Sequence, residues 1–365
     1  MKRIPLNDPG RQAAALRDEL DRAIRGVLAS GWFILGPQVE AFEAEFAGFC
    51  GATHCVGVGN GTDALELALR ALEIGPGDRV VTVANAGGYS AAAILAVGAE
   101  PLYIDVDPIS MEMDPRALAA AAGPGTRAVI VTHLYGRMAD MPAVLDAARG
   151  IPVVEDCAQA HGARLDGRAA GTWGAIGCFS FYPTKNLGAL GDGGAVITRD
   201  AALAARVRAL RQYGWRAKYH SLTPGGRNSR LDELQAAVLR AKLPHLEGWN
   251  RRRRALAGMY NQFFAEATLA RRAPSGEDDV VHLYVLRYPD RDRLRAALSA
   301  ASIGSDVHFP VPDYRQDSAA GRAWAACRLP VTEACCAEVV TLPCYPELRE
   351  EELREVARCA CASAG

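Results

Sequence analysis

Two spacings of apolar residues alternate along the first 200 positions of the chain. Apolar side chains recur every three or four residues between residues 16 and 27, and again between residues 39 and 49, which predicts two amphipathic helices. After these, short runs rich in β-branched residues predict buried strands at residues 54–58, 80–83, 102–105, 129–131, 153–154, 178–181 and 195–198. Most connections between the runs are long enough for a helix, so we expect a mainly parallel sheet covered on both faces. The last two runs lie too close together for a crossover helix, so one of them should be antiparallel.

The pattern changes in the last third of the chain. We expect a strand over residues 281–288, a helix over 290–301 and a strand over 305–309, followed by two terminal helices. The sequence therefore predicts an α/β fold with two domains. A large domain would span residues 1–245 and a smaller α+β domain residues 246–365.

Composition narrows the class of protein. The 365 residues carry 41 basic and 42 acidic side chains, and this balance favours neither nucleic acid nor an anionic membrane as a partner. The longest mainly apolar stretch, residues 91–98, is far shorter than the roughly 20 residues of a membrane span, and the chain begins without an apolar signal core. The ten cysteines include no pair with zinc-ligand spacing. We therefore expect a cytoplasmic protein with reduced thiols and no metal site.

Lysine is scarce. The chain contains only Lys2, Lys185, Lys218 and Lys242, so 41 − 4 = 37 of its basic residues are arginine. A lysine retained in such a chain is a candidate for chemistry that guanidinium cannot perform, because only an amine can lose its proton and attack a carbonyl. Lys2 is terminal and Lys242 falls in an amphipathic run, so both are interpreted as solvated charges. Lys185 and Lys218 remain as candidates.

A glycine-rich turn follows the first predicted strand. Residues 57–69 predict a strand, this turn and an amphipathic helix, and the free amides at the helix start, with the hydroxyl of Thr62, suit a phosphate group. A nicotinamide dinucleotide fingerprint would need a third glycine where Thr62 stands. A single phosphate therefore fits better than a pyrophosphate, and a plain helix cap is the alternative.

Two carboxylates stand at the end of another predicted strand. Glu155 and Asp156 follow residues 153–154, at the edge where open α/β sheets bind ligands. A carboxylate buried there needs a partner, and an aspartate that caps the following turn is the alternative. His161 lies nearby, but no second histidine or carboxylate has suitable ligand spacing, so no metal is expected.

The sharpest signal is the segment from residue 177 to residue 194. A predicted strand leads Ser180, Tyr182 and Lys185 into a loop that contains proline and several glycines, where the backbone can approach a ligand closely. A lysine in this position is able to form a Schiff base, with Ser180 on a phosphate. An exposed loop lysine is the alternative.

Four segments occur in the order typical of one enzyme family. They read Gly-Thr-Asp-Ala-Leu (61–65), Glu-Asp-Cys-Ala-Gln-Ala-His-Gly (155–162), Ser-Phe-Tyr-Pro-Thr-Lys-Asn-Leu-Gly (180–188) and Asn-Ser-Arg-Leu-Asp-Glu-Leu-Gln (228–235). With these segments the chain resembles the DegT-type sugar aminotransferases, which are pyridoxal phosphate (PLP) enzymes of the aspartate-aminotransferase fold, fold type I. The resemblance runs from residues 4–8 to residues 342–346 and so covers nearly the whole chain.

The resemblance implies roles for the matching residues. Lys185 would hold the cofactor aldehyde and move a proton, Asp156 would pair with the pyridinium nitrogen, and Gln159 would lie against the ring. The residues implied at the cofactor phosphate are Gly61, Thr62 and Ser180, joined by Asn228 from a second subunit. Active sites shared in this way imply a homodimer.

One position departs from the family pattern. Family members commonly place an aromatic residue after an Asn-Thr pair to stack on the pyridine ring. Here the segment reads Asn85-Ala-Gly-Gly-Tyr89, with Gly87 at the aromatic position. We therefore expect Tyr89 to supply the ring contact, with weaker stacking as the alternative.

The resemblance also implies a reaction. An amino group would move from L-glutamate to a ketone of a nucleotide-linked deoxyhexose, with pyridoxamine phosphate as the intermediate cofactor form. The loop over residues 186–194 resembles that of members that aminate carbon 3, so the expected substrate is a dTDP-3-keto-6-deoxyhexose. The expected substrate contacts are Tyr182, Lys218, Tyr219, Arg230, His308 and Tyr314.

Three alternatives stay open at this point. The substrate could be a 4-keto sugar or an N-acetylated UDP-sugar, or the protein could bind PLP for regulation without turnover. No basic stripe or added DNA-binding element is visible to support regulation. A sugar dehydratase of the same fold would lack the Schiff-base lysine, whereas Lys185 is present.

Overall fold

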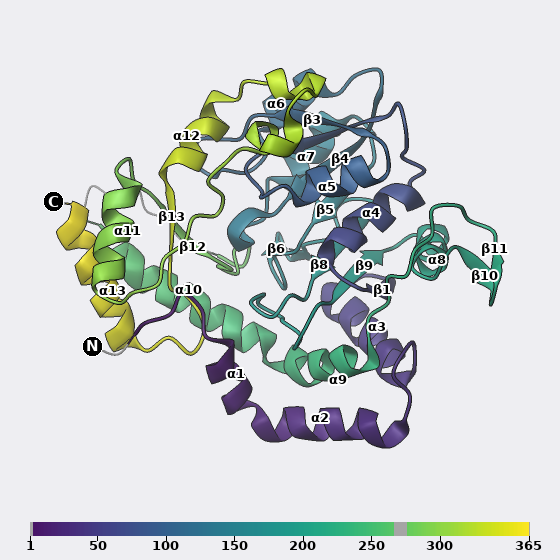
Figure 1. Cartoon of the computed structure of the whole chain (residues 1–365), viewed down its shortest axis with the longest axis horizontal. Helices are drawn as coiled ribbons and strands as arrows, with labels where there is room; N and C mark the ends of the chain where they lie inside the picture. The colour runs from purple at the N-terminus through teal and green to yellow at the C-terminus, as the bar shows by residue number, and fades with distance from the viewer. Residues whose placement is uncertain (1–2, 266–275, 365) are drawn as a thin grey trace.

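A seven-stranded sheet forms the centre of the molecule, with strand order β1-β9-β8-β5-β4-β2-β3 (Figure 1). The computed structural model describes residues 3–265 and 276–364. The strands of this sheet are β1 (His54–Val58), β2 (Arg79–Val83), β3 (Glu100–Ile104), β4 (Thr126–Thr132), β5 (Val153–Asp156), β8 (Ile176–Ser180) and β9 (Gly194–Thr198). Each of the seven strands expected from the sequence is present, with bounds that differ by a few residues.

The pairing of the strands follows the length of their connections. β3, β2, β4, β5 and β8 form a continuous parallel set, whereas β9 is antiparallel to both of its neighbours, β8 and β1. Residues 181–193, which join β8 to β9, contain no helix, so the chain turns back directly. The expectation that one of these two strands is antiparallel is confirmed.

The described helices lie on both faces of the seven-stranded sheet and around the C-terminal part of the chain. They are α1 (Pro9–Ala15), α2 (Arg17–Ser30), α3 (Pro37–Cys50), α4 (Gly61–Ala71), α5 (Tyr89–Ala96), α6 (Pro115–Ala121), α7 (Met141–Ala148), α8 (Ala201–Leu210), α9 (Glu233–Lys242), α10 (Leu246–Phe263), α11 (Arg291–Ala300), α12 (Pro330–Glu338) and α13 (Glu350–Ala364). Val81 and Val129 pack with α3, α7 and α9, whereas their neighbours Val80 and Ile130 pack with α4, α5 and α8. Because both faces are buried, the strands read as continuous apolar runs.

The C-terminal part of the chain has its own small sheet. β12 (Tyr284–Arg287) pairs antiparallel with β13 (Val339–Leu342), and α10, α11 and α13 pack beside it at the left of Figure 1. Ile4, near the start of the chain, joins the same hydrophobic cluster. The domain boundary at residue 245 stays a prediction.

The prediction of a strand over residues 305–309 is wrong. In this segment only Asp306 pairs with the sheet, through an isolated bridge to Thr341, and the strand that accompanies β12 is β13. Pro310 and Pro312 lack the N–H groups that a longer ladder would need, so the pairing does not extend. The helix expected over residues 290–301 is α11, and the two terminal helices are α12 and α13.

The remaining elements are short. They are the pairs β6 (Arg164–Leu165) with β7 (Arg168–Ala169) and β10 (Trp215–Ala217) with β11 (His220–Ser221), and the 3₁₀ turns η1 (Leu134–Gly136), η2 (Leu243–His245), η3 (Asp313–Arg315), η4 (Asp317–Ala319) and η5 (Ala323–Ala326). The β10–β11 hairpin stands out from the body at the right edge of Figure 1. Among the described helices, none has the length and apolar character that a membrane span requires.

Candidate active site

The carboxyl ends of the parallel strands meet at one edge of the sheet. β5 ends at Asp156 and β8 at Ser180, while the turn after β1 leads into α4 and the turn after β2 into α5. Open α/β sheets bind their ligands at this edge. The candidate residues of three of the sequence motifs are therefore brought together here.

Lys185 lies in a tight turn directly after β8. The Lys185 amide donates a hydrogen bond to the Tyr182 carbonyl (2.8 Å), and the Ala189 amide closes the turn on the Phe181 carbonyl (2.8 Å). Within the described part of the chain, the side-chain amine of Lys185 has no hydrogen-bond partner. Burial lowers the pKa of this amine to about 8, and the nearby carboxyl of Asp156 opposes the shift. About one amine in ten is therefore neutral at pH 7.

Asp156 is a buried carboxyl with little to balance its charge. It is 5% exposed, and its Oδ1 accepts a hydrogen bond from the Ala158 amide (3.1 Å), as in the capping role considered above. Burial raises the pKa of Asp156, while the Ala158 amide and the amine of Lys185 act in the opposite direction. Asp156 and Lys185 thus form a pair of opposite charges held in a low-dielectric site without direct contact to other ions in the described chain.

Glu155 points to the other face of β5, as strand alternation requires. Its carboxylate accepts hydrogen bonds from the ring of His133 (2.9 Å) and from the amides of Gly171, Trp173 and Gly174. His133, Glu155 and Cys157 are close enough for a metal ion, but the Nδ1 of His133 already accepts the Ala139 amide. These groups therefore serve as a structural clamp between β5 and the following loop.

The start of α4 forms a cradle against the end of β8. No described residue accepts a hydrogen bond from the amides of Gly61 or Thr62, since the cap residue Asn60 binds only the Asp63 amide (2.8 Å). A Cβ atom at Gly61 would lie 2.6 Å from the Cβ of Ser180, so only glycine allows this approach. The cradle therefore presents free amides and the Ser180 hydroxyl side by side at a helix start, where an anion is stabilised.

A second group of residues extends from Gln159. The Gln159 Oε1 accepts a short hydrogen bond from the Tyr135 amide (2.6 Å), and the Tyr135 hydroxyl donates to the His308 carbonyl. The ring of His308 is bonded to the Thr341 hydroxyl (2.8 Å). Burial lowers the pKa of His308, and the charge of Lys185 adds to this effect. His308 is therefore neutral and lies within electrostatic range of Lys185.

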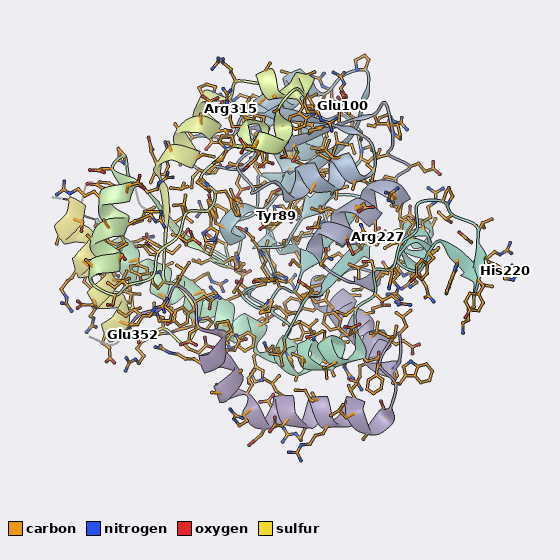
Figure 2. The ribbon with its side chains drawn as sticks, in the orientation of Figure 1. Tyr89, Glu100, His220, Arg227, Arg315 and Glu352 are labelled. Atoms are coloured by element: carbon orange, nitrogen blue, oxygen red, sulfur yellow. The ribbon has the colours of Figure 1, made fainter. Side chains whose placement is uncertain are left out.

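The aromatic side chains near Gly87 are arranged differently from the sequence expectation. Tyr89 begins α5, is 51% exposed and packs edge-on against Phe309, with ring centroids 6.1 Å apart. A Cβ at Gly87 would lie 2.8 Å from the Phe309 ring, which fills the space that a side chain at this position would need. Figure 2 shows Tyr89 near the middle of the molecule. The sequence did not point to Phe309.

Comparisons with known proteins agree with this arrangement. The model of the DegT/DnrJ/EryC1/StrS aminotransferase family matches residues 14–360. The chain belongs to this family. The expected α/β fold of the PLP-dependent transferases is confirmed by solved structures. A crystal structure of S. venezuelae DesV in complex with a ketimine intermediate superposes with a TM-score of 0.96 at 44% identity and covers 100% of this chain and 99% of that one.

Two curated relatives in the family span nearly the same length. The chain is 45% identical over 358 residues to UDP-N-acetyl-3-dehydro-alpha-D-glucosamine 3-aminotransferase of Acidithiobacillus ferrooxidans, covering 97% of this chain and 96% of the relative. It is 46% identical over 360 residues to dTDP-3-amino-3,4,6-trideoxy-alpha-D-glucose transaminase of Streptomyces venezuelae, covering 97% and 94%.

Two residues expected at the site of this family member, Lys218 and Tyr219, lie away from it in the single chain. Lys218 and Tyr219 form the tip of the β10–β11 hairpin, where the Lys218 amine lies 5.2 Å from the centre of the Tyr219 ring and Tyr219 is 76% exposed. Figure 2 labels the next residue, His220, at the margin of the molecule, far from Tyr89. Asn228 is exposed, and its neighbours lie beside the start of α4, since the Ser229 hydroxyl accepts the Gly59 amide (3.0 Å) and Arg227 pairs with Asp63 (3.3 Å). Within one described chain, Lys218 and Tyr219 therefore do not reach Lys185.

The other expected substrate contacts differ in position. Tyr182 is 52% exposed and its amide donates to the Ser180 hydroxyl (3.3 Å), so it borders the cradle. Arg230 is partly exposed in the segment before α9. Tyr314 is buried, and its hydroxyl donates to Glu333 (2.8 Å), so a substrate contact by Tyr314 has no support in this conformation.

Sequence reasoning missed the residues that support the turn of Lys185. Asn186 is buried and bonds to Asn250 of α10 (2.9 Å) and to the ring of His282 (3.1 Å). Lys242 is also buried, at 2% exposed, and donates to the Gly188 carbonyl (2.7 Å). Its interpretation as a solvated charge is therefore wrong, because one face of α9 packs on the turn. The scarcity of lysine in the sequence therefore pointed to a specific role for Lys242 as much as for Lys185.

Proposed function

We propose that this protein is a PLP-dependent aminotransferase that transfers the amino group of L-glutamate to a ketone of a nucleotide-linked sugar. The observation that carries this proposal is the geometry of Lys185. Its amine is free of hydrogen bonds, has a pKa of about 8 and lies within electrostatic range of the buried Asp156, beside the Gly61–Ser180 cradle. An amine that is partly neutral near pH 7 is able to attack an aldehyde.

The residues of the site fit the three parts of pyridoxal phosphate. The amine of Lys185 suits its aldehyde, the carboxyl of Asp156 suits its ring nitrogen, and the free amides of Gly61 and Thr62 with the hydroxyl of Ser180 suit its phosphate. The bound cofactor supplies an electron sink for the carbon that carries the amino group. Asp156 would pair with the protonated ring nitrogen, which adds a direct partner to the opposite charge that Lys185 already supplies. Lys185 then holds the proton that moves at the reacting carbon.

We infer that Gln159 and an aromatic ring complete the cofactor contacts. Gln159 follows Asp156 by three residues, and its side chain is fixed by its bond to the Tyr135 amide. Tyr89 is the aromatic contact expected from the sequence, and its ring rests on Phe309. Phe309 fills the space beside Gly87, where the family pattern leads us to expect an aromatic side chain.

We propose carbon 3 of the sugar as the acceptor. The two relatives described above are named for amination at carbon 3, although one acts on a UDP-linked and the other on a dTDP-linked sugar. A dTDP-3-keto-6-deoxyhexose is our first candidate. The UDP-linked N-acetyl 3-ketosugar is the second, because the identities of 46% and 45% do not separate the two relatives.

We propose a homodimer in which each subunit completes the other's site. Lys218 and Tyr219 lie on the hairpin tip, away from Lys185 of their own chain, and they and Asn228 are exposed and suited to bind phosphate groups. In a dimer, the partner subunit's Asn228 would reach the cofactor phosphate. The partner's Lys218 and Tyr219, with Arg230, would meet the substrate diphosphate.

Visible absorption tests the proposal directly. The purified protein, supplied with pyridoxal phosphate, should develop a visible band that L-glutamate removes, and Lys185→Ala should develop no such band. Incubation with glutamate and a panel of nucleotide ketosugars, generated in place by an upstream isomerase, should give an aminosugar by mass spectrometry. Turnover of a 4-ketosugar alone would overturn the carbon-3 assignment. A band that glutamate bleaches with no sugar turned over would favour a regulatory protein.

A further inference from the structure

A buried lysine contacts the turn that carries Lys185. Lys242, the last residue of α9, is 2% exposed, and its Nζ donates a hydrogen bond to the carbonyl of Gly188 at 2.7 Å. Gly188 lies three residues after Lys185. In the described part of the chain, no carboxylate lies within ion-pair distance of the Lys242 amine. The bond to a backbone carbonyl is therefore its principal contact.

Gly188 lies where the two backbone segments of the turn come close together. A Cβ atom at this position would lie 2.4 Å from the carbonyl oxygen of Pro183, so the two backbone segments touch. The Lys185 amide is bonded to the Tyr182 carbonyl within the same turn (2.8 Å). A shift of Gly188 must therefore displace Pro183 as well, and Lys185 lies between them.

One face of α9 holds the exit of this turn at two points. Gln235 lies seven residues before Lys242, which is two helical turns, so both side chains project from the same face. The Gln235 Oε1 accepts the Leu190 amide (2.8 Å), two residues beyond the Lys242 contact at Gly188. Both contacts leave the amine of Lys185 free.

Burial of a charged group at this position costs free energy. Burial lowers the pKa of Lys242 to about 8, although the carboxyl of Glu347 opposes the shift. A methionine would fill the same volume without this cost. The amine is not directed into water, as it would be if the side chain only covered apolar surface. What the amine adds is a charge-assisted hydrogen bond to Gly188.

We propose that Lys242 is a positioning residue for Lys185. Its ammonium fixes the Gly188 carbonyl, and through the closed turn it holds the amine of Lys185 opposite Asp156. This inference rests on the proposed function, since it gives Lys242 a part in the same reaction. It requires that loss of the Lys242 bond changes the behaviour of Lys185 more than it changes the stability of the fold.

Three variants separate these effects. Lys242→Met removes the donor and keeps the length of the side chain, and Lys242→Arg keeps a donor and a charge. Arg240→Met is the matched control, because Arg240 belongs to the same helix but forms a surface ion pair with Glu45. In the cofactor-free proteins, mass spectrometry follows acetylation of Lys185 by acetic anhydride against pH, and hydrogen exchange follows the Ala189 amide.

We expect Lys242→Met to loosen the turn that carries Lys185. Exchange of the Ala189 amide should accelerate, and the pH midpoint for acetylation of Lys185 should move back towards that of an ordinary lysine. Capture of pyridoxal phosphate on Lys185 by borohydride should slow by about tenfold or more, because small displacements of a reacting group cost large factors in rate. Arg240→Met should match the wild type, and Lys242→Arg should lie between the two.

The opposite results are equally clear. A folded Lys242→Met protein with wild-type exchange at Ala189 and wild-type acetylation of Lys185 would overturn the inference. If Lys242→Met does not fold, Lys242→Arg decides by the same two measurements. A wild-type protein that takes up no pyridoxal phosphate would refute the proposed function instead, while the exchange and acetylation data would still settle the role of Lys242.

Discussion

Removal of the reactive amine should make the cofactor-free protein more stable. In Lys185→Met the partly buried charge is replaced by an apolar side chain of similar length. The shift of the pKa of Lys185 from 10.5 to about 8 corresponds to about 3 kcal/mol against the charged form. Part of this gain is lost, because the charge of Lys185 also stabilises the ionised form of Asp156. We therefore expect a net gain of about 1 to 2 kcal/mol at pH 7.

The sign of the pH dependence follows from the direction of the shift. The folded state binds the Lys185 proton less tightly than the unfolded state does, so the penalty is fully present below about pH 8. It fades as the pH rises from about 8 towards 10.5, where the unfolded chain also loses the proton. The advantage of Lys185→Met over the wild type should therefore be largest at pH 7 and small near pH 10.

Thermal unfolding of the two cofactor-free proteins at both pH values measures this difference. For a chain of 365 residues, the expected gain corresponds to about 2 °C in Tm at pH 7. Lys218→Met is the control, because Lys218 is exposed on the hairpin and should give no gain. A Lys185→Met protein that is less stable than the wild type at pH 7, or a gain that is equal at both pH values, would refute the electrostatic reasoning.

Three further outcomes are expected. Lys185→Arg should fold and keep its charge but capture no pyridoxal phosphate on borohydride treatment, because guanidinium stays protonated; peptide mapping that finds the wild-type label on Lys218 would contradict this. Gly87→Phe should lower stability by about 1 to 3 kcal/mol, because its Cβ would lie 2.8 Å from Phe309 and its φ is +83°, and Phe309→Ala in the same chain should recover part of the loss in thermal unfolding. Equal mixing of Lys185→Ala and Asn228→Ala subunits should leave about a quarter of the sites free of both changes, so activity above that of either parent is expected; a fully active monomer in sedimentation would exclude shared sites.

The sheet was predictable because its strands are buried on both faces. Runs such as 129–131 contain few polar residues, and their period and length leave little choice of element. The segment 305–309 reads Ser-Asp-Val-His-Phe, with Val307 and Phe309 in alternate positions, but only Asp306 pairs, and Pro310 and Pro312 follow at once. Strand pairing depends on the partner's position, which a local pattern does not contain.

The same contrast between local patterns and distant partners applies to the candidate site. Residues within local motifs, such as Asp156 and Ser180, lie where their strands end, and strand ends can be read from the sequence. The supports of the turn depend on distant partners, since Asn186 meets Asn250 64 positions later and Lys242 meets Gly188 54 positions earlier. Only packing of the folded chain brings such pairs together. The local motifs therefore predict the reactive residues, whereas the residues that hold them in place become visible only in the fold.

Lysine scarcity connects these two parts of the site. Of the four lysines, Lys242 is buried and Lys185 is partly buried, and burial lowers the pKa of each to about 8. One amine makes no hydrogen bond in the described chain, and the other is bonded to the backbone beside it. A chain that uses arginine elsewhere has thus kept amines at two places where a charge is costly. At Lys185 the burial of a charge costs free energy and no hydrogen bond within the described residues offsets it, which indicates a reactive amine. At Lys242 one hydrogen bond to the backbone offsets this cost, which indicates that Lys242 supports the reactive amine.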